Sequence, residues 1–200
     1  MTCAAYVGLE TSATAIAANE QTQKRLSHET VEAHAETHAA GYDIVCSFQV
    51  LEHVADPASF ITACLKALRP GGLLFFSTPN ADSFVSMVVN YTLDLAPHHV
   101  THWHESTWEN MPQFFPMTLE WIKNEPFQEY HRAHYANTMA LALARRAVGL
   151  PEKRVDASPG HEEALRLAKQ LNDAALAILA DPRVLPARGH TTLACFRKNS

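Results

Sequence analysis

The sequence lacks the features that would indicate a metal ribbon, a secreted protein or a membrane protein. Its four cysteines are far apart and form no CxxC pair, which excludes zinc-ribbon and thioredoxin-like motifs. No apolar run approaches the roughly 20 residues of a membrane span. No lysine or arginine precedes Lys24, so the N-terminus does not resemble a secretory signal. We therefore expect a cytoplasmic protein with reduced thiols and no membrane partner.

The chain also lacks an excess of basic charge. It has 16 basic and 21 acidic residues, and a net charge of −5 disfavours a nucleic acid partner. Apolar residues make up 47% of its 200 residues, which is typical of an ordinary globular protein. This length suits a single domain over residues 1–200 with a sizeable core.

The central segment predicts a strand, a helix and a second strand. Ile44 to Phe48 is apolar without alternation, as in a strand buried on both faces of a parallel sheet. Asp56-Pro57 supplies an N-cap and a proline for the start of a helix, and Pro70-Gly71-Gly72 ends it. Leu73 to Ser77 follows as a second buried strand. These elements form one βαβ unit.

The rest of the chain continues the alternation of strands and helices. We expect further strands at 6–10, 24–31, 119–122 and 191–196, and helices at 13–21, 132–148 and 160–180. The last helix places an apolar stripe on one face, made of Ala164, Leu165, Ala168, Leu171, Ala175 and Ile178. The pattern predicts an α/β doubly wound domain. Residues 125–189 form a helical insertion or cap before the last strand.

Four short motifs together resemble a known family. Tyr42-Asp43-Ile44-Val45, Leu51-Glu52-His53-Val54, Leu68-Arg69-Pro70-Gly71-Gly72-Leu73-Leu74 and Ser77-Thr78-Pro79-Asn80 resemble class I S-adenosylmethionine-dependent methyltransferases of the ubiquinone-biosynthesis-like group. The resemblance implies a Rossmann-like methyltransferase sheet with S-adenosylmethionine across the carboxyl ends of its strands. It also implies methyl transfer to a small-molecule acceptor, which the sequence does not identify.

The resemblance assigns cofactor-binding residues at three places. Glu10, after the second strand of the family, matches the acid that binds the ribose hydroxyls, although it could instead cap the next helix. Glu29, Thr30 and Val31 match the adenine-binding position or a plain surface loop. Phe48, Gln49 and Val50 match the turn beside the methionine part of the cofactor.

Histidines are the candidate catalytic residues. His53 either lines the methyl-transfer pocket or hydrogen-bonds its turn. His98 and His99 are candidates for a general base or for substrate contact, because the loop after the family's fifth strand faces the acceptor; the alternative is a structural loop. His98, His99, His102 and His104 also invite a metal interpretation, but their spacing matches no standard zinc pattern. We expect no metal site.

The first strand of the family and its glycine-rich turn are missing. Only Gly8 precedes Glu10, where the family has a strand ending in a GxGxG-like loop. We therefore expect an N-terminally truncated chain, a sheet without its first strand and weak cofactor binding. The competing hypothesis is a truncated or inactive methyltransferase-fold protein that acts as an interaction module. It would form a homodimer through the open sheet edge or the 130–180 helices.

Overall fold

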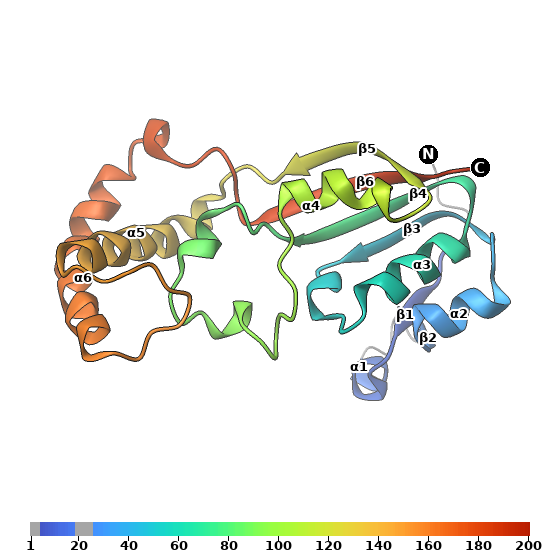
Figure 1. Ribbon diagram of the computed structural model, residues 1–200, viewed down its shortest axis with the longest axis horizontal. Helices are drawn as coiled ribbons and strands as arrows, with labels where there is room; N and C mark the ends of the chain where they lie inside the picture. The colour runs from blue at the N-terminus through green and yellow to red at the C-terminus, as the bar shows by residue number, and fades with distance from the viewer. Residues whose placement is uncertain (1–4, 19–25) are drawn as a thin grey trace.

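Strands and helices alternate along the computed structural model, which describes residues 5–18 and 26–200. The strands are β1 (Gly8–Glu10), β2 (Leu26–His28), β3 (Tyr42–Phe48), β4 (Leu68–Pro79), β5 (Met117–Asn124) and β6 (Thr191–Lys198). The helices are α1 (Ala13–Ala18), α2 (Val31–Thr37), α3 (Pro57–Ala67), α4 (Glu105–Asn110), α5 (Arg132–Ala147) and α6 (Pro159–Ile178). Figure 1 shows an elongated molecule with the sheet at one end and α5 and α6 at the other.

The predicted βαβ unit is confirmed as β3, α3 and β4. The Asp56 carboxylate accepts the N–H of Ser59 at 3.1 Å, and Pro57 is the first residue of α3. Strands β3 and β4 pair in parallel, with Val45 opposite Leu74. Strand β4 is longer than predicted and runs to Pro79, because its last residues still pair with β6.

The sheet is split between β1 and β3. One sheet has the order β3-β4-β6-β5, in which β6 is antiparallel to both neighbours. Strands β1 and β2 form a separate parallel pair. Within residues 5–18 and 26–200, β3 has a single strand partner, so its other edge carries backbone groups that no strand pairs. This agrees with the predicted α/β sheet without its first strand.

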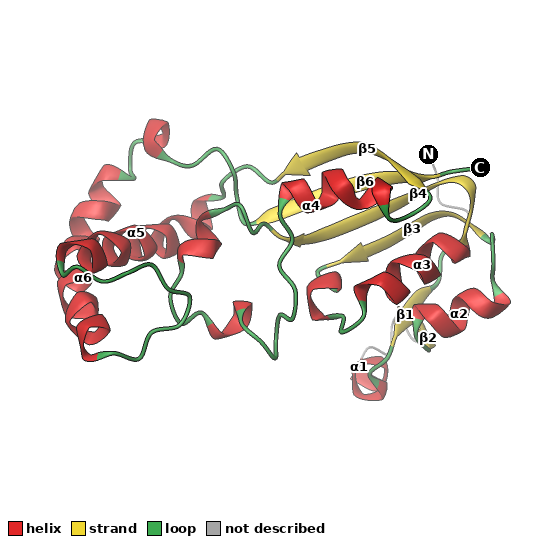
Figure 2. Ribbon diagram, in the orientation of Figure 1, coloured by secondary structure: helices red, strands yellow, loops and turns green. Residues whose placement is uncertain are grey.

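The main core lies on one face of the four-stranded sheet. Phe76 of β4 and Phe196 of β6 are fully buried there against Trp108 of α4. Figure 2 shows α3 and α4 alongside the sheet. Further buried members of this core are Leu51, Ile61, Cys64, Leu65, Leu68, Leu74, Met111 and Met117. This packing anchors α3 and α4 and thereby fixes the strand ends that precede the site.

The opposite face of the sheet is open at β3, so one sequence prediction is wrong. Ile44 to Phe48 was expected to be buried on both faces, yet Ile44 is 43% exposed and Phe48 is 56% exposed. Cys46 between them is also exposed. Side chains alternate along a strand, so these three share one face while Val45 and Ser47 point toward α3. No described helix covers that face at β3.

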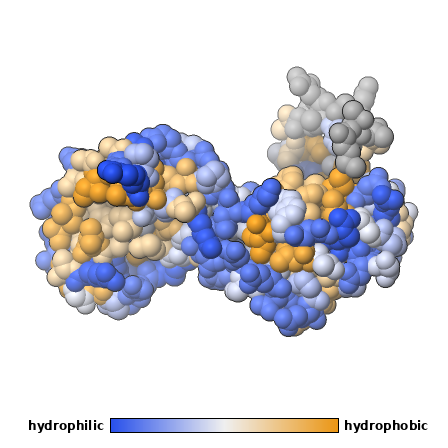
Figure 3. Space-filling model, turned by 90° about the horizontal axis from the view of Figure 1, so that it is seen from above, coloured by the Kyte–Doolittle hydropathy of each residue, from blue (hydrophilic) through white to orange (hydrophobic). Residues whose placement is uncertain are grey.

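Helices α5 and α6 form a second lobe with its own small core. Its centre is buried alanine, namely Ala140, Ala144, Ala164 and Ala168. In α6, Leu165 is 46% exposed and Ile178 is 63% exposed, so the apolar stripe predicted for residues 160–180 is only partly buried. The small alanine side chains allow α5 and α6 to pack closely, and the larger residues at the margin of the stripe fall outside that contact. Figure 3 shows apolar side chains on the surface of both lobes, which a narrow polar waist separates.

A buried polar network joins this lobe to the loop that follows β4. Arg145 of α5 donates to the Asp156 carboxylate at 2.9 Å, and both side chains are buried. Asn90 donates to the backbone carbonyl of Asp156 at 2.7 Å. The loop between β4 and α4 is therefore held from the helical side as well as from the sheet.

Two expected elements have different limits. The strand expected over 24–31 is wrong at its C-terminal end, because β2 ends at His28 and Val31 already begins α2. Helix α1 ends at Ala18, and the rest of the helix expected over 13–21 lies outside the described residues. Among the described residues, no helix is long and apolar enough to cross a membrane.

We predict that the core around Phe76 carries much of the stability of the sheet. Phe76→Ala should lower the free energy of unfolding by about 3–5 kcal/mol, because it removes a fully buried ring and leaves a cavity. Phe114 is 77% exposed, so Phe114→Ala should change it by less than ~0.5 kcal/mol. Urea unfolding followed by circular dichroism measures both. Equal losses in the two variants would contradict this assignment of the core.

Candidate functional site

The three candidate catalytic histidines meet in space. His53 lies in the 3-10 turn Leu51–His53 that follows β3, and His98 and His99 lie in the loop before α4. One ring nitrogen from each lies within 4.8 Å of the other two. The ring of His53 is 4.7 Å from the ring of His98 and 4.7 Å from that of His99, centre to centre. We call His53, His98 and His99 the histidine trio.

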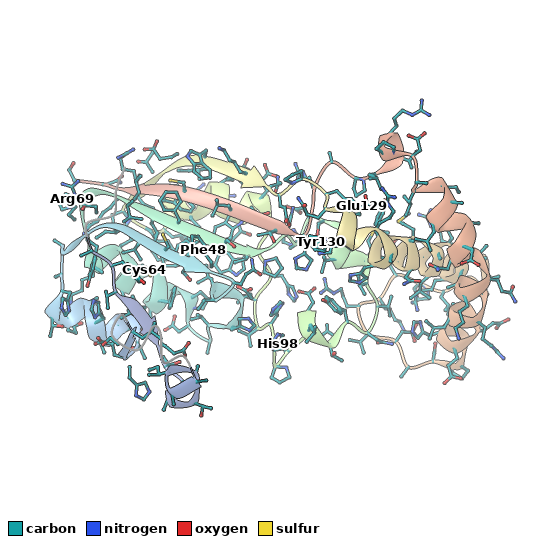
Figure 4. The ribbon with its side chains drawn as sticks, turned by 180° about the vertical axis from the view of Figure 1, so that it is seen from behind. Phe48, Cys64, Arg69, His98, Glu129 and Tyr130 are labelled. Carbon is teal, nitrogen blue, oxygen red and sulfur yellow. The ribbon has the colours of Figure 1, made fainter. Side chains whose placement is uncertain are left out.

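Backbone hydrogen bonds bring the trio together. The carbonyl of Glu52 accepts the N–H of Val100 at 2.9 Å and that of Thr101 at 3.3 Å. The Thr101 hydroxyl adds a bond to the carbonyl of Leu51 at 3.3 Å. Val100 and Thr101, which directly follow His99, are thus bonded to the turn that carries His53. Figure 4 shows His98 at the outer end of this loop.

Two of the trio are oriented through Nδ1. His53 Nδ1 lies 2.6 Å from the carbonyl oxygen of His98, an acceptor that requires the proton on Nδ1. His99 Nδ1 lies 2.9 Å from a carboxylate oxygen of Asp94, which requires the same. Neutral imidazole then carries its free lone pair on Nε2. Both rings can therefore offer Nε2 to a proton or an electrophile.

Asp94 is the buried centre of this arrangement. Its side chain is 5% exposed and also forms an ion pair with Arg154. His102 Nε2 donates to its backbone carbonyl at 2.9 Å. A carboxylate held between Arg154 and His99 has little freedom to turn. The orientation of the His99 ring is thus set by contacts that reach into the helical lobe.

Glu52 places a buried acid next to the trio. Its side chain is 2% exposed, and Oε1 lies 3.9 Å from His53 Nε2. The other oxygen, Oε2, is buried without a hydrogen-bond partner among the described residues. Burial raises the pKa of the Glu52 carboxyl, opposed by its backbone hydrogen bond and by the neighbouring histidines. A small cavity beside it is lined in part by Asp94, His99 and Trp103.

The four histidines that are close in sequence do not form the cluster. His104 turns away and contacts a carboxylate oxygen of Asp82 at 2.7 Å through Nδ1. His102 is directed to Asp94, as described above. The spatial cluster instead takes His53 from a different segment. Sequence proximity therefore selects the wrong set of histidines.

The last residue of β3 and the turn that follows it present apolar surface. Phe48 is 56% exposed and Val50 is 41% exposed. Gln49 between them has a φ of 55°. Its N–H donates to the Ser77 carbonyl at 2.8 Å, and its side chain donates to the Ser77 hydroxyl at 3.0 Å. Figure 4 shows Phe48 on this part of the sheet. The turn is held by β4 while its two apolar side chains stay accessible.

Glu10 lies at the end of β1, as predicted, and also caps the next turn. One of its carboxylate oxygens accepts the N–H of Ser12 at 2.8 Å. The Ser12 hydroxyl in turn accepts the N–H of Ala15 at 3.2 Å. The capping role that the sequence left open is therefore present, and it uses one of the two oxygens.

Glu29 and Thr30 lie directly before α2, which begins at Val31. Thr30 caps α2 by accepting the N–H of Ala33 at 3.2 Å. The hydroxyl of Ser27 donates to Glu29, and so does His34 Nδ1 at 2.9 Å; these bonds lower the pKa of the Glu29 carboxyl. Val31 packs against buried alanines of α2 and α3. All three residues have local structural partners, and Glu29 and Thr30 lie in the short connection between β2 and α2.

Sequence reasoning missed the groups that orient the trio. Asp94 and Arg154 belong to no motif, and Glu52, although part of the Leu51-Glu52-His53-Val54 motif, was assigned no role. Asp94 and Arg154 are 60 residues apart in sequence, and only the packing of the helical lobe brings them together. An acidic residue five positions before His99 was the one available signal, and it is too common to be informative.

We predict that Glu29 stabilises the fold through its charge. Its lowered pKa means that this stability is present above its ordinary value of 4.5 and is lost as pH falls through the lowered value. Glu29→Gln should therefore lower stability at pH 7 and leave it unchanged in acid, where the carboxyl is protonated in both states. Urea unfolding at the two pH values measures this. Glu163→Gln, at an exposed position of α6, serves as the control. An equal loss at both pH values would contradict the prediction.

Comparison with known proteins gives the chain its family. The methyltransferase domain family matches residues 2–122. Ubiquinone biosynthesis O-methyltransferase of Sodalis glossinidius is 37% identical over 107 residues, which are 52% of this chain and 41% of that protein. The same enzyme of Pectobacterium carotovorum is 41% identical over 109 residues, 52% of this chain and 42% of that protein. The match thus spans about two fifths of the length of these relatives.

Solved structures support the fold. A SAM-dependent methyltransferase from Archaeoglobus fulgidus matches with a TM-score of 0.55 and 14% identity, over 96% of this chain and 75% of that one. The [4+2]-cyclase SpnF matches with a TM-score of 0.54 and 13% identity, over 98% of this chain and 66% of that one. At such identity the likeness concerns the fold alone, and a cyclase among the matches shows that the fold does not set the reaction. The family match, the strand order and the βαβ motifs together show that this chain belongs to the methyltransferase domain family of class I S-adenosylmethionine-dependent methyltransferases.

Proposed function

We propose that the protein transfers a methyl group from S-adenosylmethionine to a hydroxyl oxygen of a small-molecule acceptor in the cytoplasm. The observation that carries this proposal is the histidine trio, which lies at the carboxyl ends of β3 and β4. Ligands of open α/β sheets bind at such strand ends. The relatives that are named O-methyltransferases support oxygen as the acceptor atom.

The end of β3 suits the cofactor of this family. Half-exposed Phe48 and Val50 offer an apolar wall for its methionine part, and Gln49 holds the turn in place. Glu10 has one carboxylate oxygen beyond its capping bond for a ribose hydroxyl. When bound, S-adenosylmethionine supplies an electrophilic methyl carbon. Strands β1 and β3 lie in separate sheets, which supports the expectation of weak cofactor binding by these 200 residues.

Residues 29–31 would bind the adenine ring without hydrogen bonds from their side chains. The side chains of Thr30 and Glu29 already hydrogen-bond to residues of α2. An adenine ring would therefore contact the backbone and the apolar atoms of this segment. Val31 would contribute little because it packs toward α3. We keep the segment as the adenine position and assign no hydrogen bond to its side chains.

The trio would act on the acceptor hydroxyl. A hydroxyl is a weak nucleophile, and a positioned base that removes its proton contributes about 10²–10⁴-fold in rate. His99 is suited to this role because Asp94 fixes its ring and leaves Nε2 free to accept. His53 and His98 would contact the acceptor from the two sides of the site. Holding donor and acceptor together would supply the remaining acceleration.

The proposal predicts a selective loss of activity in a histidine variant. We expect His99→Ala to lower kcat by about 10²–10⁴-fold, measured as S-adenosylhomocysteine formed with a panel of small phenols and other hydroxyl compounds. His104→Ala is the control, since His104 lies on the same loop but contacts Asp82. Absence of product with every acceptor, or an unchanged rate in His99→Ala, would contradict the proposal.

The open face of β3 favours a second candidate function, that of an interaction module. Ile44, Cys46 and Phe48 expose apolar surface along a strand whose outer edge no described strand pairs. Such a strand is a template for pairing with another chain. A second copy of this chain would cover both the edge and the apolar face. The exposed side of α6, with Leu165 and Ile178, is the competing surface.

Two charge substitutions separate these surfaces. If the chain dimerises through β3, Ile44→Asp should convert the dimer to monomer in analytical ultracentrifugation, because it places a charge in the apolar contact. Ile178→Asp should then leave the dimer intact, and the reverse result would assign the interface to α6. A chain that stays monomeric at all concentrations would contradict the interaction module in its homodimeric form.

A further inference from the structure

We propose that the histidine trio binds one divalent transition-metal ion, such as Zn²⁺, with the buried Glu52 carboxylate beside it as a counter-charge. Imidazole nitrogen is a preferred ligand of zinc, copper, nickel and iron. Three protein ligands plus an open position are typical of catalytic zinc sites. Among the described residues, His53, His98 and His99 form the one group of three such side chains with this proximity. This proposal replaces the expectation, drawn from the spacing of the loop histidines, that the chain has no metal site.

The distances require only a small adjustment. The three ligand atoms lie within 4.8 Å of one another. Zinc–nitrogen bonds of about 2.0–2.1 Å in a tetrahedral site place ligand atoms roughly 3.4 Å apart. His98 is exposed, so its ring can move inward by rotation about its side-chain bonds. His99 is 11% exposed and would form the fixed side of the site.

The hydrogen bonds behind the rings are those that metal-binding histidines use. Such a histidine donates its other ring N–H to a carboxylate or a backbone carbonyl, which fixes the ring and its tautomer. His99 makes this bond to Asp94 at 2.9 Å, and His53 makes it to the carbonyl of His98 at 2.6 Å. The orientation of these rings is a separate observation from their proximity. It points both Nε2 atoms away from the supporting groups.

Glu52 supplies an independent indication of a bound cation. Its Oε2 is buried and has no hydrogen-bond partner among the described residues, and its side chain is 2% exposed. A buried polar atom without a partner is costly, and native structures rarely leave one. Its Oε1 is 3.9 Å from His53 Nε2, so the carboxylate already borders the trio. A cation at the trio would give this acid a counter-charge.

The binding of the ion does not depend on methyl transfer, but its role rests on the proposed function. A hydroxyl group bound to a divalent ion loses its proton at lower pH than a free one. With the ion bound, His99 Nε2 is a ligand, and the ion takes over from it the activation of the acceptor hydroxyl. The O–H proton would pass to solvent, and the O–C bond would form as the bond between the methyl carbon and sulfur breaks. The ion keeps its charge throughout. The open position would thus take the acceptor oxygen.

The test measures metal binding in the absence of methyl donor and acceptor. The 200-residue chain, without a histidine tag and freed of metal by chelation, is titrated with Co²⁺ and followed by its visible absorption; Zn²⁺ then competes. We expect one ion per chain. His53→Ala, His98→Ala and His99→Ala should each weaken binding by about 10-fold or more, and Glu52→Gln by a smaller factor.

His104→Ala is the matched control, because it removes a histidine of the same loop that lies outside the trio. It should leave the affinity unchanged. The exposed positions of His53 and His98 keep the test decisive even if His99→Ala fails to fold, which circular dichroism would reveal. No binding, binding that survives in both the His53 and His98 variants, or an equal loss in His104→Ala would overturn the proposal. Metal binding without any methyl transfer would support the site and count only against the proposed function.

Discussion

The histidine site depends on one backbone carbonyl. The carbonyl of Glu52 accepts hydrogen bonds from Val100 and Thr101, and these fasten the loop before α4 to the turn after β3. Because backbone groups make these bonds, the contact does not depend on the identity of the loop side chains. It places His98 and His99 against His53, which lies 45 residues earlier than His98 in sequence. The Thr101 hydroxyl and His53 Nδ1 add one further hydrogen bond each between the loop and the turn.

Two groups of contacts support the loop from opposite sides, one in the sheet and one in the helical lobe. On the sheet side, Phe76, Trp108 and Phe196 hold α4 against β4 and β6. On the helical side, Asn90 and Arg145 bind the segment around Asp156, while Arg154 reaches Asp94. The loop is therefore fixed at both ends by buried or charged contacts. A long irregular segment held in this way can position side chains precisely enough for chemistry.

The open face of the sheet and the site are related through β3. The strand ends in the turn that carries Gln49 and His53, and its apolar side chains Ile44 and Phe48 remain exposed. Val45 and Ser47, on the other face, are covered by α3. One strand thus has a buried side that anchors the site and an exposed side that is available for a cofactor or another chain. This asymmetry explains why one segment supports two different functional hypotheses.

The sequence by itself determined the features that arise from local chemistry. Asp56 and Pro57 predicted the start of α3, because capping is a property of neighbouring residues. The helix ends at Ala67, before the predicted stop at Pro70-Gly71-Gly72, which lies within β4. The motifs around β3 and β4 identified the family. Tertiary structure decided which histidines meet, that Asp94 orients His99, and that one face of β3 is open. The meeting of His53 with His98 joins residues 45 apart, and Asp94 is held for His99 by Arg154, 60 residues further along; no local pattern predicts such contacts. Burial of a strand is likewise set by what packs on it, so the apolar run Ile44 to Phe48 predicted a strand correctly and its environment wrongly.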